Sequence, residues 1–148
     1  MLCQEIMKRD VKCVAPTDSV QVAARLMRDE NIGFVPVCDE RKHVLGTITD
    51  RDLAIRILAD GKASTVPVSE AMSHDVVSCR PDDELRRAEA LLARNKKSRI
   101  MIVADDDSLV GVISLSDIAQ VDDQDAHVAK TLRRVTEREA APPGGAKA

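Results

Sequence analysis

Aromatic side chains are almost missing from this sequence of 148 residues, which has no tryptophan, no tyrosine and one phenylalanine, Phe34. A planar ligand would therefore lie between aliphatic side chains and backbone, and not in an aromatic cage. Binding of single-stranded nucleic acid depends on aromatic stacking, and general nucleic-acid binders carry a surplus of basic residues. Because the net charge here is -3, the composition argues against a nucleic-acid partner.

Long apolar segments are missing too. No run of the sequence approaches the roughly 20 apolar residues needed to cross a bilayer, so we expect no membrane partner. The first residues, Met1–Glu5, do not combine a basic region with an apolar one, as a signal peptide would. We therefore expect a cytoplasmic protein.

Residue groups that perform catalysis or bind metals are not evident either. The four cysteines show no Cys-x-x-Cys spacing, so no zinc cluster is indicated, and His43, His74 and His127 lie far apart in the chain. No pattern combines a nucleophile, a base and an orienting acid. The sequence thus predicts a protein that is not an enzyme, without a cofactor or metal site.

What the sequence does contain is an internal repeat. When the chain is shifted so that Met7 falls on Met72, residues 7–54 align with residues 72–119 without a gap. One copy of about 65 residues would bury only ~60% of its unfolded surface, so we expect two copies packed together. The repeat predicts a first domain at residues 1–66, a second at 67–121, and a tail at 122–148.

Each copy has the pattern of a β-α-β-β-α unit, which predicts an α/β (α+β) fold. Asp18 and Ser19 are N-cap candidates for the first long helix, because their side-chain oxygens accept bonds from free helical N–H groups. In the tail, Val128, Leu132 and Val135 have helical spacing, and residues 141–148 predict a disordered end. The expected elements of the first copy are a strand at 11–14, a helix from 20, strands at 34–38 and 44–49 and a helix at 53–61; those of the second are a helix from 85, strands at 99–104 and 109–114 and a helix from 115.

One motif occurs in both copies, where a strand passes into a helix. Gly46–Asp52 and Gly111–Asp117 both read Gly-x-Ile-(Thr/Ser)-x-x-Asp. The hydroxyl lies beside unpaired N–H groups at a helix start, where an anion is favoured, and the carboxylate can accept bonds from two vicinal hydroxyls. A phosphate bound by the hydroxyl and the N–H groups, with a ribose bound by the carboxylate, would make a nucleotide site. The glycines of the motif permit close approach to the strand.

The same motif has a purely structural interpretation. A Ser or Thr followed three residues later by an acid is close to a capping box, in which each side chain bonds the backbone N–H of the other residue. This alone would explain Thr49 with Asp52 and Ser114 with Asp117. Two copies at equivalent points of a gapless repeat make chance occurrence less frequent, but a duplicated cap stays an alternative.

Residues 2–120 resemble a tandem pair of CBS domains, the cystathionine-β-synthase-type repeat that is also called a Bateman module. Glu5-Ile6-Met7, Gly33–Val37 and Val44–Leu53 carry the resemblance. It implies two repeats packed through their sheets with pseudo-twofold symmetry, and clefts between them that bind AMP, ADP, ATP or, less readily, S-adenosylmethionine. It also implies a homodimer. The chain is similar to the stand-alone pairs of hypoxic-response type, so we expect a regulatory energy or metabolite sensor that acts on an unidentified protein.

The resemblance also assigns ligand-binding residues. The ribose-binding acid of the family maps onto Asp52 and Asp117, and its hydroxyl residue onto Thr49 and Ser114. Segments flanking the adenine base and apolar walls complete the two clefts. The further residues assigned in this way are Cys13, Val14, Ala15, Val77 and Ser78 beside the base, and Pro36, Val37, Met101 and Ile102 as walls.

The second copy departs from the family pattern. Arg99–Ile102 replaces the frequent Leu-Pro-Val, which implies a differently shaped cleft. Arg51 is a candidate for reaching a phosphate in the first copy, whereas Leu115 and Ser116 offer no equivalent. Charge could come there from Arg99 and the lysines before it, Lys96 and Lys97, although such runs are usually solvated surface. We therefore expect the Asp52 site to bind more strongly than the Asp117 site.

Two other functions stay open. Cys13 ends the first predicted strand and Cys38 the second, and the hypoxic-response pairs carry cysteines at both places, which raises the prospect of a redox-sensitive disulfide. Two reduced, buried cysteines are the usual state in cytosol. The chain could also be a ligand-free dimerisation or adaptor module whose Thr-x-x-Asp motifs are only helix caps.

Overall fold

The computed structural model describes residues 1–121, 131 and 133–135. Most of the predicted tail, including Val128, Leu132 and the predicted disordered end, lies outside these residues. Within the described part of the chain, no helix is long and apolar enough to cross a membrane. The described chain forms two compact units, and each is described by itself.

The two units exchange the short segments that precede each repeat. The first-repeat unit consists of Asp10–Val76 with Asp105–Leu109, and the second-repeat unit consists of Met1–Arg9 with Val77–Ala104 and the described residues from Val110 onwards. We call residues 1–9 and 68–76 the lead-in segments. Each lead-in segment therefore belongs to the unit that contains the strands of the other copy. The structural units thus differ from the domains predicted from the repeat, which divide the chain between residues 66 and 67.

In the first-repeat unit the helix α2 (Val20–Glu30) begins at Ser19, whose side chain accepts a hydrogen bond from the backbone N–H of Val22. It ends where Asn31 adopts a left-handed conformation with φ of 54°, a residue type that tolerates this geometry. The strands β1 (Phe34–Cys38) and β2 (Val44–Thr49) pair in an antiparallel manner, with Phe34 opposite Thr49. Beyond β2 lie α3 (Asp50–Asp52), the π-helix η1 (Leu53–Leu58) and the 3-10 helix η2 (Val68–Glu70).

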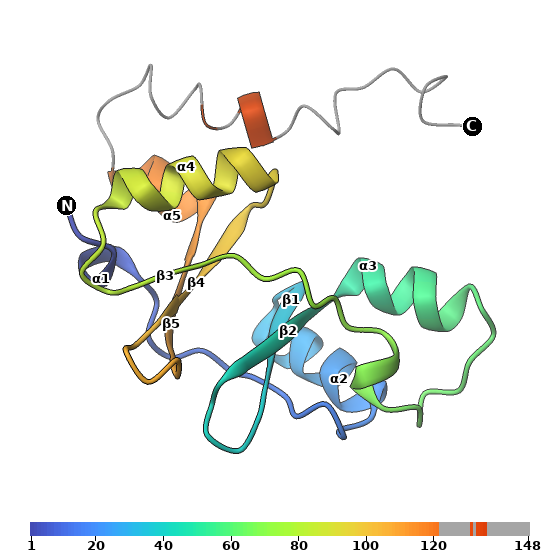
Figure 1. Cartoon of the computed structure of the whole chain (residues 1–148). Coiled ribbons are helices and arrows are strands. Elements are labelled where there is room, and N and C mark those ends of the chain that lie inside the picture. Colours follow the sequence, from blue (N-terminus) through green and yellow to red (C-terminus); the bar gives the residue numbers. More distant parts are fainter. Residues whose placement is uncertain (122–130, 132, 136–148) are drawn as a thin grey trace. The chain divides into compact units, whose positions relative to one another are not determined.

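In the second-repeat unit the sheet has the order β3-β4-β5, and β3 pairs with β4 in a parallel manner. The elements in this unit are α1 (Cys3–Ile6), β3 (Ser78–Cys79), α4 (Leu85–Asn95), β4 (Arg99–Val103), β5 (Leu109–Ser114) and α5 (Leu115–Val121). Figure 1 labels them along the chain. The predicted strands at 34–38, 44–49 and 109–114 are confirmed, and the strand predicted at 99–104 ends at Val103.

A lead-in segment pairs with the far edge of each sheet. In the first-repeat unit Ser73 forms an antiparallel bridge with Thr47 of β2, and in the second-repeat unit Lys8 does so with Val112 of β5. These are equivalent positions of the repeat. The lead-in segments therefore supply an additional strand-like edge to each unit.

One prediction about regular structure was wrong, and another holds in part. The strand expected at residues 11–14 is reduced to a parallel bridge between Val14 and Val37, because Val14 alone exchanges backbone bonds with β1. The helix expected from Leu53 is present as a π-helix, and its predicted apolar face is partly exposed, with Leu58 at 78% exposure. Ile57 of the same face is buried, and Leu53 packs against the core.

Each unit has its own apolar core. In the first-repeat unit Val20, Ala23 and Met27 of α2 pack with β1, Ile48 of β2 and the lead-in residue Met72. In the second-repeat unit α4, α5 and the strands enclose a cluster that also contains Val135. Val135 is the described part of the predicted apolar face of the tail, and it is buried at 7% exposure.

Candidate functional site

Thr49 and Asp52 form a reciprocal capping box at the end of β2. The Thr49 hydroxyl accepts a hydrogen bond from the Asp52 N–H at 3.1 Å, and Asp52 Oδ2 accepts one from the Thr49 N–H at 2.9 Å. The capping box that the structural interpretation predicts is therefore present here. The Asp52 side chain keeps 17% of its surface exposed, so the box does not close it off from solvent.

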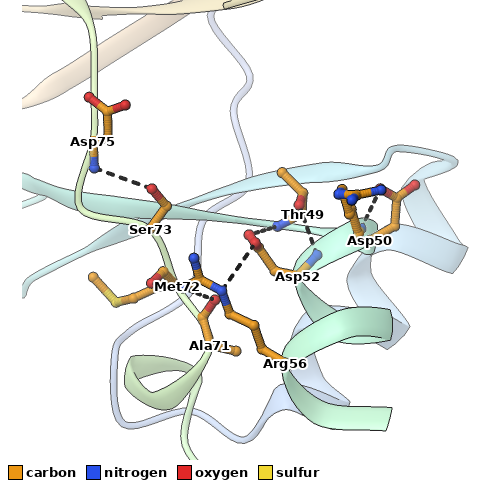
Figure 2. A network of polar contacts seen from close by, with 9 residues as sticks. Thr49, Asp50, Asp52, Arg56, Ala71, Met72, Ser73 and Asp75 are labelled. Carbon is orange, nitrogen blue, oxygen red and sulfur yellow. Dashed lines mark hydrogen bonds and ion pairs between the residues drawn. The ribbon is translucent and has the colours of Figure 1, made fainter. Parts of the chain in front are cut away.

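The second oxygen of Asp52 faces a basic side chain. Arg56 Nε lies 3.9 Å from Asp52 Oδ1, and Arg56 Nη1 donates to the carbonyl oxygens of Met72 at 3.1 Å and Ala71 at 3.4 Å. Figure 2 shows Arg56 between the carboxylate and these carbonyl groups of the lead-in segment. Ser73 follows directly and exchanges two backbone bonds with Thr47, at 2.8 and 2.9 Å. Arg56 thus joins the repeated motif to the lead-in segment of the same unit.

The second-repeat unit contains the equivalent box. Asp117 Oδ2 accepts a hydrogen bond from the Ser114 N–H at 2.9 Å, and the Ser114 hydroxyl accepts one from the Asp117 N–H at 3.2 Å. Lys8 Nζ lies 3.4 Å from Asp117 Oδ1, and the Asp117 side chain is 14% exposed. Each repeated aspartate therefore uses one oxygen for a cap and presents the other to a basic residue.

Arg56 and Lys8 were missed in the sequence. Arg56 follows Asp52 by one helical turn, and this spacing could have identified it. Nothing in the local sequence pairs Lys8 with Asp117, because the contact depends on the exchange of lead-in segments. Arg51, the predicted phosphate-reaching residue, is exposed, and its backbone N–H donates to Asp50 Oδ1 at 2.8 Å.

The two motif glycines give room to the lead-in segments. A Cβ atom on Gly46 would collide with the backbone oxygen of Ser73 and lie 2.7 Å from Met72 Cε, and one on Gly111 would lie 2.6 Å from Met7 Sδ. Close approach at these glycines was predicted for a ligand. The described close neighbour is the chain itself.

The other predicted ligand residues fall into two groups. The proposed walls belong to the cores of their units, since Pro36, Val37 and Ile102 are fully buried and Met101 has 2% exposure. Val14 is buried as well, at 5% exposure. The remaining ones are accessible to solvent: Cys13, Ala15 and Val77 are half-buried, and Ser78 and Arg99 are exposed.

A cavity of about 680 Å³ opens in the first-repeat unit. It is lined by residues 13–17 and by the hairpin that joins β1 to β2, from Cys38 to His43. Because Phe34 pairs with Thr49 and Cys38 with Val44, the hairpin lies at the opposite end of this strand pair from the capping box. Of the predicted ligand residues of this unit, the cavity includes Cys13, Val14 and Ala15, and Thr49, Arg51 and Asp52 are not among its lining.

The four cysteines are free thiols in two pairs. Cys13 and Cys38 hydrogen-bond to each other, as their predicted proximity requires, and burial together with the nearby Cys13 raises the pKa of Cys38 to about 12. Cys3 and Cys79 form a second pair in the other unit, and this pair was not predicted from the sequence. Their mutual hydrogen bond lowers the pKa of Cys3 and, together with burial, raises that of Cys79. Among the described residues, no group of three or more His, Cys, Asp and Glu side chains is placed to hold a metal ion.

The repeated unit, its glycine motif and its capping aspartate are those of a CBS domain. The CBS domain matches residues 3–59 and 68–123, and the chain therefore belongs to the CBS domain family and contains a tandem pair of these domains. The resemblance seen in the sequence is confirmed.

Two curated relatives match most of the chain. The CBS domain-containing protein YhcV of Bacillus subtilis is 40% identical over 116 residues, which cover 78% of this chain and 81% of that protein. Hypoxic response protein 1 of Mycobacterium tuberculosis is 26% identical over 118 residues, covering 79% of this chain and 82% of the relative. The expected kinship with hypoxic-response pairs is thereby confirmed.

Solved structures share the fold. The crystal structure of Hypoxic Response Protein I with two coordinated zinc ions has a TM-score of 0.74 and 25% identity, over 82% of this chain and 98% of that one. The crystal structure of CBSX2 in complex with AMP has a TM-score of 0.69 and 23% identity, over 80% and 93% of the two chains. The likeness to CBSX2 supports the fold alone.

Proposed function

We propose that this CBS pair is a non-catalytic regulatory module that binds an adenosine nucleotide, AMP, ADP or ATP, at the repeated aspartates. The observation that carries the proposal is that the two oxygens of each carboxylate make different contacts. In both units Oδ2 accepts the backbone bond of the cap, and Oδ1 lies beside a basic side chain, on a carboxylate side chain that keeps 14–17% of its surface exposed. An oxygen of this kind can accept hydrogen bonds from the vicinal hydroxyls of a ribose.

The capping box supports this role, because it fixes the carboxylate before a ligand arrives. A side chain that is already immobilised loses less rotamer freedom on binding, and this lowers the cost of association. The Thr49 and Ser114 hydroxyls stay beside the first helical N–H groups, where an anionic phosphate is favoured. A solved structure of the same fold, that of CBSX2, holds AMP, which agrees with an adenosine ligand for this chain.

The test is calorimetric titration of the reduced full chain with AMP, ADP, ATP and S-adenosylmethionine, with Asp52→Asn as the main variant. Asparagine keeps a carbonyl oxygen that can accept the Thr49 N–H, so the cap is largely retained while the charge is removed. Hydrogen bonds to a charged group contribute about 1.5–3 kcal/mol. We therefore expect nucleotide binding at this site to weaken by roughly 10- to 100-fold.

Asp50→Asn is the matched control, since it removes the same charge from an exposed position in the same helix. The proposal requires that this variant binds no more weakly than the wild type does. Binding that falls equally in both variants would indicate a general effect of charge. A wild-type chain that binds none of the four compounds would refute the proposal.

The adaptor function is the second candidate, and the completed capping boxes favour it. If Asp52 served only as a cap, Asp52→Ala would lower the free energy of unfolding by about 1 kcal/mol and would leave association with a partner unchanged. Urea unfolding of Asp52→Ala measures the loss of the cap, which both functions predict. Titration of the same variant distinguishes the two functions, because only the sensor function predicts a loss of nucleotide binding.

A further inference from the structure

Both repeated aspartates have a basic side chain within 4 Å of Oδ1, the oxygen that takes no part in the cap, but the two basic residues come from different elements. Arg56 belongs to η1, one turn after Asp52, and its Nε lies 3.9 Å from Oδ1. Lys8 belongs to the lead-in segment of the second-repeat unit, and its Nζ lies 3.4 Å from Asp117 Oδ1.

The repeat makes this pairing informative. The position equivalent to Arg56 in the second copy is Val121, and the position equivalent to Lys8 is Ser73. Neither basic residue is therefore duplicated, although the ion pair is present in both units. Ion pairs with solvent-exposed basic side chains contribute little to stability, so the pairing itself adds little beyond the bonds that Arg56 also donates to the carbonyl oxygens of Ala71 and Met72.

A cation at this place has a clear use if the ligand is anionic. The ribose that would bind Oδ1 carries its 5′-phosphate on the same ring, and Asp50 adds a second negative charge to the first motif. Without a compensating charge, the carboxylates would repel the phosphate. The Arg56 side chain is 50% exposed and that of Lys8 is 74% exposed, so Lys8 can turn from the carboxylate to a phosphate when hydroxyls occupy Oδ1. Arg56 can do the same with its Nε, or by giving up its bonds to the carbonyl oxygens of Ala71 and Met72.

We propose that Arg56 and Lys8 are specificity-determining residues, which select a phosphorylated nucleoside over uncharged adenosine and over the cationic S-adenosylmethionine. The inference rests on the proposed function and adds to it the residues that recognise the ligand's charge. It replaces Arg51 as the phosphate-reaching residue of the first copy and supplies a counterpart for the second copy.

The experiment compares AMP with adenosine by calorimetry on the reduced full chain. Asp117→Asn isolates the Asp52 site, and Asp52→Asn isolates the Asp117 site. In the first background we expect Arg56→Gln to weaken AMP binding at least tenfold and to leave adenosine binding unchanged. Arg56→Lys should retain most of the preference for AMP, and Arg51→Gln should leave it intact.

The second site permits a transplant. Lys8→Ser gives the lead-in segment the residue of the other copy, and we expect it to remove the preference for AMP at the Asp117 site. Adding Val121→Arg places a cation one turn after Asp117, as Arg56 stands after Asp52, and should restore the preference. A merely structural role for Lys8 would not be rescued by a cation on a different element.

The outcomes separate the two proposals. If the wild type binds AMP through Asp52 but Arg56→Gln and Lys8→Ser leave the ratio of AMP to adenosine affinity unchanged, the selection inference is wrong and the proposed function stands. An equal loss of AMP and adenosine affinity would make these residues positioning groups and would also overturn the inference. If the wild type binds none of AMP, ADP, ATP and S-adenosylmethionine, the proposed function itself fails. Urea unfolding of each variant verifies that it is folded.

Discussion

Asp52 and Thr49 bind each other twice, through two hydrogen bonds that run in opposite directions at 2.9 and 3.1 Å. The same arrangement recurs between Asp117 and Ser114. A helix cap and a ligand site are often treated as competing explanations for a motif of this kind. In the proposed nucleotide site they use different oxygens of one carboxylate, so the cap would fix the group that the ligand binds.

The first prediction concerns the hydroxyl half of the box. Thr49→Val removes the acceptor of the Asp52 N–H without changing the shape of the side chain. We expect the free energy of unfolding to fall by about 1 kcal/mol, as measured by urea denaturation. Because the Thr49 N–H still bonds Asp52 Oδ2, nucleotide binding should fall less than in Asp52→Asn. A larger loss of binding in Thr49→Val would assign the main ligand contact to the hydroxyl.

The second prediction compares the two motif glycines. A methyl group on Gly46 meets the backbone of Ser73, whereas one on Gly111 meets the flexible side chain of Met7, which can move. Overpacking typically costs 1–3 kcal/mol, so we expect Gly46→Ala to cost about 2–3 kcal/mol and Gly111→Ala about 1 kcal/mol. Urea unfolding gives both changes in the free energy of unfolding. Equal changes would show that the backbone of Ser73 moves aside as easily as the side chain of Met7.

The third prediction concerns pH and the thiol of Cys38. Its pKa is raised to about 12 from an ordinary value of 9, so the unfolded chain releases this proton at lower pH than the folded chain. The corresponding stability is complete below pH 9 and is lost as the pH rises towards 12. We expect the urea midpoint to fall between pH 8.5 and about 10.5, and Cys38→Val to reduce this slope. An unchanged slope in the variant would contradict the assignment.

The same pair has an expected order of reactivity. Both cysteines line the cavity, but Cys13 is half-buried, whereas Cys38 has 3% exposure and a raised pKa. Since the thiolate is the reactive form, iodoacetamide should modify Cys13 first at pH 8, as peptide mass spectrometry would show. The predicted Cys13–Cys38 disulfide is tested by treating the chain with a small-molecule disulfide and mapping the peptides. Faster modification of Cys38 would contradict the described burial.

A fifth prediction uses the repeat as its own control. Cys3 and Cys79 occupy the positions that Val68 and Val14 occupy in the other copy, and all four side chains are buried in the cores. The double variant Cys3→Val/Cys79→Val should therefore change stability by less than about 1.5 kcal/mol. A loss above about 3 kcal/mol would show that the core of the second-repeat unit depends on the thiol pair.

Local patterns in the sequence predicted the strands at 34–38 and 44–49, the cap at Ser19 and the box at Asp52 because each depends on neighbours a few residues away. The prediction of a strand at residues 11–14 was wrong, because Val14 forms only a single bridge with Val37. An apolar segment has the same composition whether it forms one bridge or a longer ladder. Lys8 was missed for a different reason: its contact with Asp117 depends on which unit the lead-in segment joins, and residues so distant in the chain leave no local signal.

The exchange of lead-in segments also bears on how the chain can be divided. A fragment of residues 1–66 lacks Met72 and Ser73, which fill the core and the β2 edge of the first-repeat unit. A fragment of residues 10–76 keeps both. A deletion at the boundary of the repeat would take an edge away from the copy that remains, so neither half of the duplicated gene can be discarded without damaging the other.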